Sequence, residues 1–542
     1  MAMTLFKHVA LLLVSLSYVL SFNLSGNKYR FVIKSLSARC VSSPINNLQA
    51  TSTSSTSERN TAVSSKPKIK PTARYVAISA LAKASDGSFA TRELEQSTHY
   101  QSLDQRDKAF ARLLVATAER RLGQIDIILK NCISKYPPKK GKHSNIIQAT
   151  LRVGVSQLVF LDTKPFAAIK ETVQVLRIHR PKVPEPMIKF VNGVLRNLSR
   201  PPKGEDTDEV MLGQKLVKEK TSSQDNIAPW MLKQWQKDWG VEKTKLICEE
   251  MIPSNDSLVN SRIDLSTIYS RAINGNSDHK DKLQSLMTDL GDDCTLLPQG
   301  SIRIGSSLKG DVKLWPGYEN GVWWVQDASS TLPAIVLTSA LYDKHKDDIS
   351  DLHVVDMCSA PGGKTSQLLS AGYRHVTAIE ANPRRSRRLS ENLERLGMKC
   401  EVAVEEGQNW KPTDAVHGIL VDVPCSATGT GSRRPDVLRR TDNLTELLSI
   451  QETLANHCAD NILNVGGIMV YATCSILKEE SEDQVHKLVE RGNVETLPIQ
   501  PHEVPGYEEA IDDNGWLRVL PGVLEGDLKS TDGFFVARLI RK

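Results

Sequence analysis

The chain has no pair of cysteines in the C-x-x-C spacing, although nine cysteines occur among its 542 residues. Zinc sites and the disulfide frameworks of small secreted proteins depend on clustered, regularly spaced cysteines. The scattered arrangement argues against both, and we expect no bound metal. Free thiols in a reducing compartment are the better interpretation, so a cysteine with a function is expected to be a nucleophile.

The chain also lacks an apolar segment long enough to cross a bilayer. The apolar run Val9–Phe22 is short and contains Ser15, Ser17 and Ser21. A spanning helix needs about 20 consecutive apolar residues. We therefore expect no membrane partner.

No acidic residue precedes Glu58, although the same stretch contains Lys7, Lys28, Arg30, Lys34 and Arg39. A secretory signal has a charged start and an apolar core, whereas an organelle transit peptide is basic, rich in serine and poor in acids. The Ser/Thr tract 51–57 and the absence of acids after Phe22 favour a transit peptide. We expect residues 1–66 to be a disordered targeting segment for the chloroplast, with the mitochondrion as the alternative.

The charge balance is nearly even, with a net charge of +6. A mildly basic chain is compatible with nucleic acid binding and does not demonstrate it. Apolar residues make up 40% and charged residues 24% of the chain, which is typical of a globular protein. The length allows roughly three domains.

The periodicity divides the chain after the targeting segment. Residues 72–200 have helical periodicity, with apolar faces that include Val76 and Leu114. Residues 201–227 are polar and aperiodic, so we expect a linker. Residues 228–322 mix helix and strand patterns and predict a small α+β module. Residues 323–542 then alternate strands and helices.

The segment from Leu352 to Thr365 organises the last domain. An apolar run that ends at Met357 predicts a buried strand, the turn Pro361-Gly362-Gly363 follows, and a helix pattern begins after it. Strand, glycine turn and helix are how a Rossmann-like α/β sheet holds a nucleotide-like ligand. The segment has neither the G-x-x-x-x-G-K-[ST] nor the G-x-G-x-x-G spacing.

Polar residues follow the other predicted strands. Glu380 ends strand two about 20 residues past the glycine turn, where an acid can grip a ribose, and Glu406 is expected at the end of strand three. Strand four ends at Asp422 and leads to Cys425, and strand five ends at Cys474. Parallel strands share one crevice at their carboxyl ends, so the two thiols are expected to face each other.

These motifs resemble the RNA 5-methylcytosine methyltransferases. The resemblance rests on Asp356–Thr365, on Asp422-x-Pro424-Cys425-Ser426 and on Thr473-Cys474-Ser475. The segments 151–158 and 190–196 resemble the all-helical NusB-type RNA-binding domain. A NusB-like region before such a catalytic domain is similar to the Sun/RsmB branch, which modifies small-subunit ribosomal RNA.

The resemblance implies a role for each matching residue. S-adenosylmethionine would be lined by Cys358, Ser359, Ala360, Pro361, Gly362, Gly363 and Lys364. Glu380 would hold its ribose, Glu406 would lie by the adenine, and Asp422 would border the methionine end and the target base. Cys474 would be the nucleophile and Cys425 would assist release. The family more often has Asp at the positions of Glu380 and Glu406, which leaves cofactor affinity open.

The chemistry explains why such a site needs thiols and a carboxylate. Carbon 5 of cytosine is a poor nucleophile until a thiolate adds at carbon 6. Asp422, protonated or hydrogen-bonded at ring nitrogen 3, would stabilise the charge pushed into the ring. The base must leave its stack to reach the pocket, so we expect a single-stranded or loop site.

Two other functions remain open from the sequence. A transfer-RNA 5-methylcytosine methyltransferase would use the same thiols, and only the N-terminal region argues for ribosomal RNA. A ribosome-assembly factor that binds RNA without catalysis would not need both thiols. We expect small-subunit ribosomal RNA as the partner and a monomeric enzyme.

Overall fold

The computed structural model describes residues 71–84, 89–134, 141–161, 163–202, 210–253, 262–269, 277–345, 348–440 and 444–542. The predicted targeting segment, 1–66, lies outside these residues. The chain divides into a unit Met1–Pro67 and a compact unit Lys68–Lys542, and the description below concerns the second. Within the described ranges, no helix combines the length and the apolar character that crossing a membrane requires.

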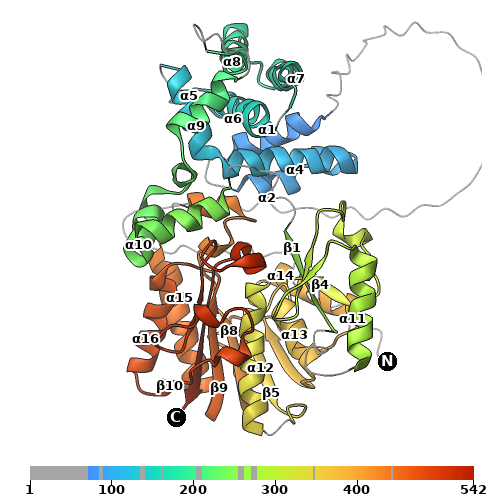
Figure 1. Ribbon diagram of the computed structural model, residues 1–542, viewed down its shortest axis with the longest axis vertical. Helices are drawn as coiled ribbons and strands as arrows, with labels where there is room; N and C mark the ends of the chain where they lie inside the picture. Colours follow the sequence, from blue (N-terminus) through green and yellow to red (C-terminus); the bar gives the residue numbers. More distant parts are fainter. Residues whose placement is uncertain are drawn as a thin grey trace, which may run out of the picture. The chain divides into compact units, whose positions relative to one another are not determined.

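The first part of this unit is a helical domain with one apolar core (Figure 1). Helix α1 packs against α4 and α6, and α6 packs against α7 and α8. The expected apolar faces are confirmed, because Val76 and Leu114 are both buried in this core. The helices are α1 Ala73–Ala84, α2 Ala90–Glu95, α3 Thr98–Gln101, α4 Gln105–Arg120, α5 Leu122–Cys132, α6 Ser144–Val155, α7 Pro165–Ile178 and α8 Glu185–Leu198.

The expectation of an aperiodic linker over 201–227 is wrong for its second half. Helix α9, Leu212–Lys220, and a 3-10 turn, Ser223–Asn226, occupy this part. Only Leu212, Leu216 and Val217 of α9 pack against the helical core, so the sequence has too few apolar positions to show a period. The turn is held by the backbone N–H of Gln124, which donates to Oδ1 of Asn226 at 3.1 Å.

A small antiparallel sheet follows, as the α+β expectation requires. Its strand order is β2-β3-β1-β4, and helix α11 contributes to its core. Strand β4 lies beyond the expected boundary at 322, so one strand of the small sheet comes from the segment that we assigned to the next domain. The elements are β1 Ile263–Thr267, α11 Ser277–Leu290, β2 Thr295–Leu296, β3 Ile302–Ile304 and β4 Trp323–Val325.

Helix α10, Pro229–Met251, packs against the last domain, although the expected boundary at 228 groups it with the small sheet. Its buried Met231 and Trp235 share a core with Leu438 and Ile476 of the last domain. The indole nitrogen of Trp239 also donates to the Ile476 carbonyl at 2.8 Å. The boundary at 228 therefore separates α10 from the domain whose core it shares, and local sequence patterns do not show this packing.

The last domain is an α/β domain built on a mixed sheet, which confirms the expected Rossmann-like class. The order β10-β12-β9-β8-β5-β6-β7 places five parallel strands, β9 to β7, beside the antiparallel β12 and β10, and β11 forms a hairpin with β12. The strands are β5 His353–Met357, β6 His375–Ile379, β7 Glu401–Ala403, β8 Val416–Asp422, β9 Leu463–Thr473, β10 Val494–Thr496, β11 Leu517–Val519 and β12 Phe534–Arg541.

Helices cover both faces of this sheet, because successive strand side chains point to opposite sides. Helices α12 and α13 pack against residues such as Val354 on one face. Helices α15 and α16 pack against residues such as Val355 on the other. These helices are α12 Leu332–His345, α13 Gly363–Ala371, α14 Pro383–Arg395, α15 Leu444–His457 and α16 Glu482–Glu490.

Candidate active site

The predicted site residues gather where the parallel strands end. Met357 is paired with Val421 across β5 and β8, and Asp422 is paired with Ala472 across β8 and β9. Cys474 directly follows β9, and Cys425 lies in the loop that follows β8. The sheet register therefore brings both thiols to one edge, as the sequence indicates.

The thiol pair is the centre of this edge. The Cys425 and Cys474 sulfur atoms lie 3.4 Å apart, and both side chains are partly buried. The sulfur contact and burial raise the pKa of Cys425 well above its ordinary value. Cys425 therefore keeps its proton near neutral pH and can donate it in a hydrogen bond to the sulfur of Cys474.

The serines after the two cysteines tie the loops together. The hydroxyl oxygens of Ser426 and Ser475 are 3.1 Å apart, and the Thr428 hydroxyl lies 3.1 Å from Ser475. The Ser481 hydroxyl lies 2.9 Å from that of Thr473. These buried hydroxyls link the loop that carries Cys425 to the segment that carries Cys474.

A buried carboxylate, Glu480, anchors the loop that carries Cys425. It accepts hydrogen bonds from the backbone N–H of Ser426 at 2.8 Å and from the Gln451 amide at 3.0 Å, and the Ser426 hydroxyl also donates to it. Gln451 reaches on to the Pro424 carbonyl at 2.9 Å. Sequence reasoning missed this role, although an acid close behind Thr-Cys-Ser was a usable signal.

Lys364 and Asp422 form an ion pair at the same edge. The Lys364 ammonium lies 2.8 Å from Asp422 Oδ2 and 5.2 Å from the ring centroid of Phe534. Burial alone would lower the pKa of Lys364, but the Asp422 carboxylate outweighs it and raises the pKa above the ordinary value. The sequence placed these two residues in one pocket and did not predict that they pair.

The turn from Cys358 to Gly363 brings the backbone close to this pocket. Gly362 has a φ of 104°, which favours glycine, and a Cβ at this position would come within 2.7 Å of Leu389 Cδ1. Helix α13 begins at Gly363, so its first N–H groups are open to a ligand at the end of β5. The thiol of Cys358 is a poor nucleophile here, because burial raises its pKa to about 12.

Beneath the turn, Asp356 is completely buried in β5. The Thr365 hydroxyl donates to Asp356 Oδ2 at 2.6 Å, while Oδ1 has no hydrogen-bond partner among the described residues. Burial raises the pKa of Asp356 to about 7. Asp356 therefore links the strand to the helix that begins at Gly363.

Glu380 directly follows β6, as the sequence predicts, and is 3% exposed. Its Oε1 accepts the Asn382 N–H at 2.9 Å. Its Oε2 has no hydrogen-bond partner within the described ranges, and the Arg385 guanidinium is 3.4 Å away. A buried carboxylate oxygen without a hydrogen-bond donor can accept hydrogen bonds from the hydroxyl groups of a sugar.

Glu406 does not stand where the sequence places it. Strand β7 ends at Ala403, before Glu405-Glu406-Gly407, so Glu406 lies in the loop after the strand. Its side chain is exposed, and the contacts described for the chain do not join it to Glu380 or to the thiols. Strand β7 ends at Ala403 because its pairing with β6 ends there.

A second ionic cluster links the small sheet to this domain. The Arg262 guanidinium bridges Asp327 at 3.0 Å and Asp532 at 2.9 Å, and Arg433 also pairs with Asp532. Both aspartates are buried.

Of the residues the structure describes, no three His, Cys, Asp or Glu side chains form a group that could hold a metal.

The comparisons with known proteins agree with this geometry. The profile of the family described as 16S rRNA methyltransferase RsmB/F matches residues 343–540, and the profile of the NusB family matches residues 71–200. Ribosomal RNA small subunit methyltransferase B of Klebsiella pneumoniae subsp. pneumoniae is 30% identical over 450 residues, which are 82% of this chain and 92% of the relative.

The protein of the same name from Shigella sonnei is 30% identical over 453 residues, with the same coverage of 82% and 92%. The crystal structure of PH0851 covers 88% of this chain and 100% of its own, with a TM-score of 0.63 and 18% identity, which supports the fold alone. The matches span both the helical and the catalytic domain. The chain therefore belongs to the RsmB/F family of RNA methyltransferases.

Proposed function

We propose that the protein methylates carbon 5 of a cytosine in small-subunit ribosomal RNA, using S-adenosylmethionine and a covalent adduct with Cys474. The observation that carries the proposal is the pair of thiols 3.4 Å apart at the ends of β8 and β9. Methylation at a ring nitrogen or a ribose hydroxyl needs no thiol nucleophile, whereas carbon 5 must be activated by addition at carbon 6.

The residues present fit S-adenosylmethionine. Glu380 Oε2, which is 3.4 Å from Arg385 but accepts no hydrogen bond from the described residues, could accept one from a ribose hydroxyl, and the turn at Gly362 and Gly363 lets the backbone approach. When bound, the cofactor supplies a methyl group on a sulfonium centre. Lys364 and Asp422 would flank its methionine end. The exposed Glu406 is a weaker candidate for the adenine than the sequence suggested.

The reaction begins at Cys474. Its thiolate would add to carbon 6 of the cytosine, the carbon 5–carbon 6 double bond would open, and carbon 5 would become nucleophilic. A sulfonium cofactor held beside Lys364 and Asp422 would supply the methyl group and keep the electron pair of its sulfur–methyl bond as a neutral thioether. Cys425 remains protonated because of its raised pKa, so it can donate a hydrogen bond to the Cys474 sulfur 3.4 Å away. After transfer, a general base removes the proton from carbon 5 of the cytosine. The bond between carbon 6 and the Cys474 sulfur then breaks, and Cys474 leaves as a thiolate.

Cys425 is assigned to this release step, in which the leaving sulfur needs a proton donor at close range. The separation of 3.4 Å allows Cys425 to protonate or hydrogen-bond the departing sulfur. The ranking of the two cysteines rests on the resemblance to the family and on the Thr473-Cys474-Ser475 context. The geometry alone is nearly symmetric.

Asp422 is expected to stabilise the cytosine ring together with Lys364, its ion-pair partner. The carboxylate is ion-paired with Lys364, so it needs a proton before it can donate to ring nitrogen 3. The raised pKa of Lys364 keeps its proton in place, so Asp422 would take its proton from solvent, and the Lys364 ammonium, 2.8 Å from Oδ2, would offset the negative charge that builds in the ring. The pair would then stabilise the activated base.

Small-subunit ribosomal RNA is supported by the helical domain that matches the NusB family and by the printed names of the relatives. Bisulfite sequencing of plastid, mitochondrial and cytosolic ribosomal RNA, and of transfer RNA from the same compartments, with and without the protein, tests this substrate. We expect one cytosine of an organellar small-subunit RNA to be methylated when the protein is present and unmethylated when it is absent. Loss from transfer RNA alone would overturn the substrate and leave the reaction in place.

A further inference from the structure

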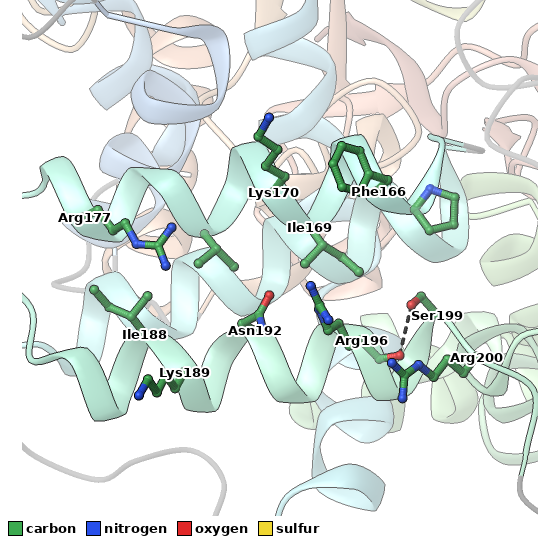
Figure 2. Close-up of a pocket in the computed structure, with 12 residues that line it drawn as sticks. Phe166, Ile169, Lys170, Arg177, Ile188, Lys189, Asn192, Arg196, Ser199 and Arg200 are labelled. Carbon is green, nitrogen blue, oxygen red and sulfur yellow. Dashed lines mark hydrogen bonds between the residues drawn. The ribbon is translucent and has the colours of Figure 1, made fainter.

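Helices α7 and α8 enclose a groove of about 500 Å³ in the helical domain (Figure 2). The floor of this groove is apolar, because Ile169, Val173 and Ile188 are all less than 8% exposed. Its rim is basic and consists of five exposed cations, Lys170, Arg177, Lys189, Arg196 and Arg200. The described residues that line the groove include no carboxylate.

The positive charge of this rim is only weakly neutralised. Arg177 is 3.8 Å from Glu185, but both side chains are more than half exposed, so water and salt screen the pair. The described part of the chain gives Lys189, Arg196 and Arg200 no ion-pair partner. Arg177 and Arg196 point into the space between the helices (Figure 2). Such a rim attracts a polyanion.

An aromatic ring stands at one end of the groove. Phe166, in the first turn of α7, is 76% exposed, and the Lys170 ammonium lies 5.5 Å from its ring centroid. A phenylalanine this exposed gains nothing from the core of its own domain. Exposed aromatic rings between cations are what proteins use to stack single-stranded bases beside bound phosphates. An acidic peptide would use the cations but gain little from the flat ring.

We propose that the α7–α8 groove binds a single-stranded segment of the RNA substrate, with phosphates against Arg177, Arg196 and Arg200 and a base stacked on Phe166. The inference rests on the proposed function for RNA as the substrate, and it adds a second contact in a different domain from the thiols. Bound there, the segment holds the RNA on the enzyme while the target base is delivered.

The test is fluorescence anisotropy of the full chain with labelled oligouridine at several salt concentrations, without cofactor. Phe166→Ala is expected to weaken binding about tenfold, and Phe166→Tyr to keep it because a ring remains. Arg196→Ala and Arg200→Ala should each reduce the slope of log affinity against log salt by about 0.7, as a lost phosphate contact on a single strand does. These side chains are exposed, so the domain should stay folded.

Matched controls are Phe89→Ala, which removes another exposed phenylalanine, and Lys130→Ala, which removes an exposed cation of α5. Both should bind as the unaltered protein does. Unchanged RNA binding in Phe166→Ala and Arg196→Ala, or equal competition by polyglutamate, would overturn the groove assignment. Methylation at saturating RNA should persist in the groove variants. Its absence in the unaltered protein would refute the proposed function instead.

Discussion

The hydroxyl oxygen of Ser426 lies 3.1 Å from that of Ser475, one residue beyond the two thiols in each loop. This buried contact joins the loop after β8 to the end of β9. The Glu480 carboxylate completes it, because it accepts from both the backbone and the side chain of Ser426. We therefore expect the distance between Cys425 and Cys474 to depend on hydrogen bonds made by the residues that follow them.

Replacing Glu480 by Ala should consequently lower both stability and activity. The change leaves the donors of Ser426 and Gln451 buried without an acceptor, which costs about 1.5–3 kcal/mol. Guanidinium unfolding followed by circular dichroism measures the loss. The control is Glu479→Ala in the same turn, which we expect to be nearly neutral. A Glu480→Ala protein with unaltered midpoint and turnover would show that the network does not position the thiols.

The pH dependence of stability should report Asp356. Burial raises its pKa from 3.8 to about 7, so the folded protein binds this proton more tightly than the unfolded chain. Its contribution is therefore fully present below about pH 4 and is lost as the pH rises through 7, by about 4 kcal/mol at most. Asp356→Asn should flatten that part of the curve relative to the unaltered protein. Equal slopes for the two proteins between pH 4 and 7 would contradict the assignment.

Cofactor affinity should depend on Glu380 and on the glycine turn. Glu380→Ala removes a charged acceptor, which costs about 1.5–3 kcal/mol or roughly tenfold or more in affinity. Gly363→Val adds atoms to a backbone whose Cβ would already meet the Gln326 side chain at 3.3 Å. Calorimetry with S-adenosylmethionine measures both, with the exposed Glu405→Ala as the control. Unchanged binding in both site variants would exclude this pocket.

The thiol pair is the part of the site that the sequence predicts best. Alternating strands and helices indicate a parallel sheet, and parallel strands bring their carboxyl ends together, so Cys425 and Cys474 follow from topology. The pairing of Lys364 with Asp422 does not follow, because it depends on side-chain directions across two strands. Glu480 was missed for a similar reason, since its partners lie 29 and 54 residues away.

The errors in the fold predicted from the sequence also arise from contacts between residues far apart in the chain. Helix α9 has too few buried residues to show a period, and α10 packs against a loop that only the folded chain brings near it. The end of β7 was misplaced because strand termination is set by the neighbouring strand rather than by the local residues, and Glu406 was misplaced with it. Local patterns define elements, whereas partners between distant elements are set by packing.

The N-terminal segment is proposed to carry the protein into an organelle. Fusion of residues 1–66 to a fluorescent protein should direct it to chloroplasts, because the stretch before Glu58 is basic and free of acids. Microscopy with a mitochondrial marker separates the two organelles. Replacing Arg30 and Lys34 by Glu should abolish import. Secretion of the fusion, or a nucleolar signal, would exclude targeting to either organelle.

The central claim is that Cys474 attacks the base and Cys425 releases it. The most direct measurement is a denaturing gel of the full chain incubated with small-subunit RNA and S-adenosylmethionine. Cys425→Ala should accumulate a protein–RNA band that ribonuclease removes, whereas Cys474→Ala and the double variant should form none. A band with Cys474→Ala but not with Cys425→Ala would reverse the two roles, and full methylation by both single variants would contradict the mechanism altogether.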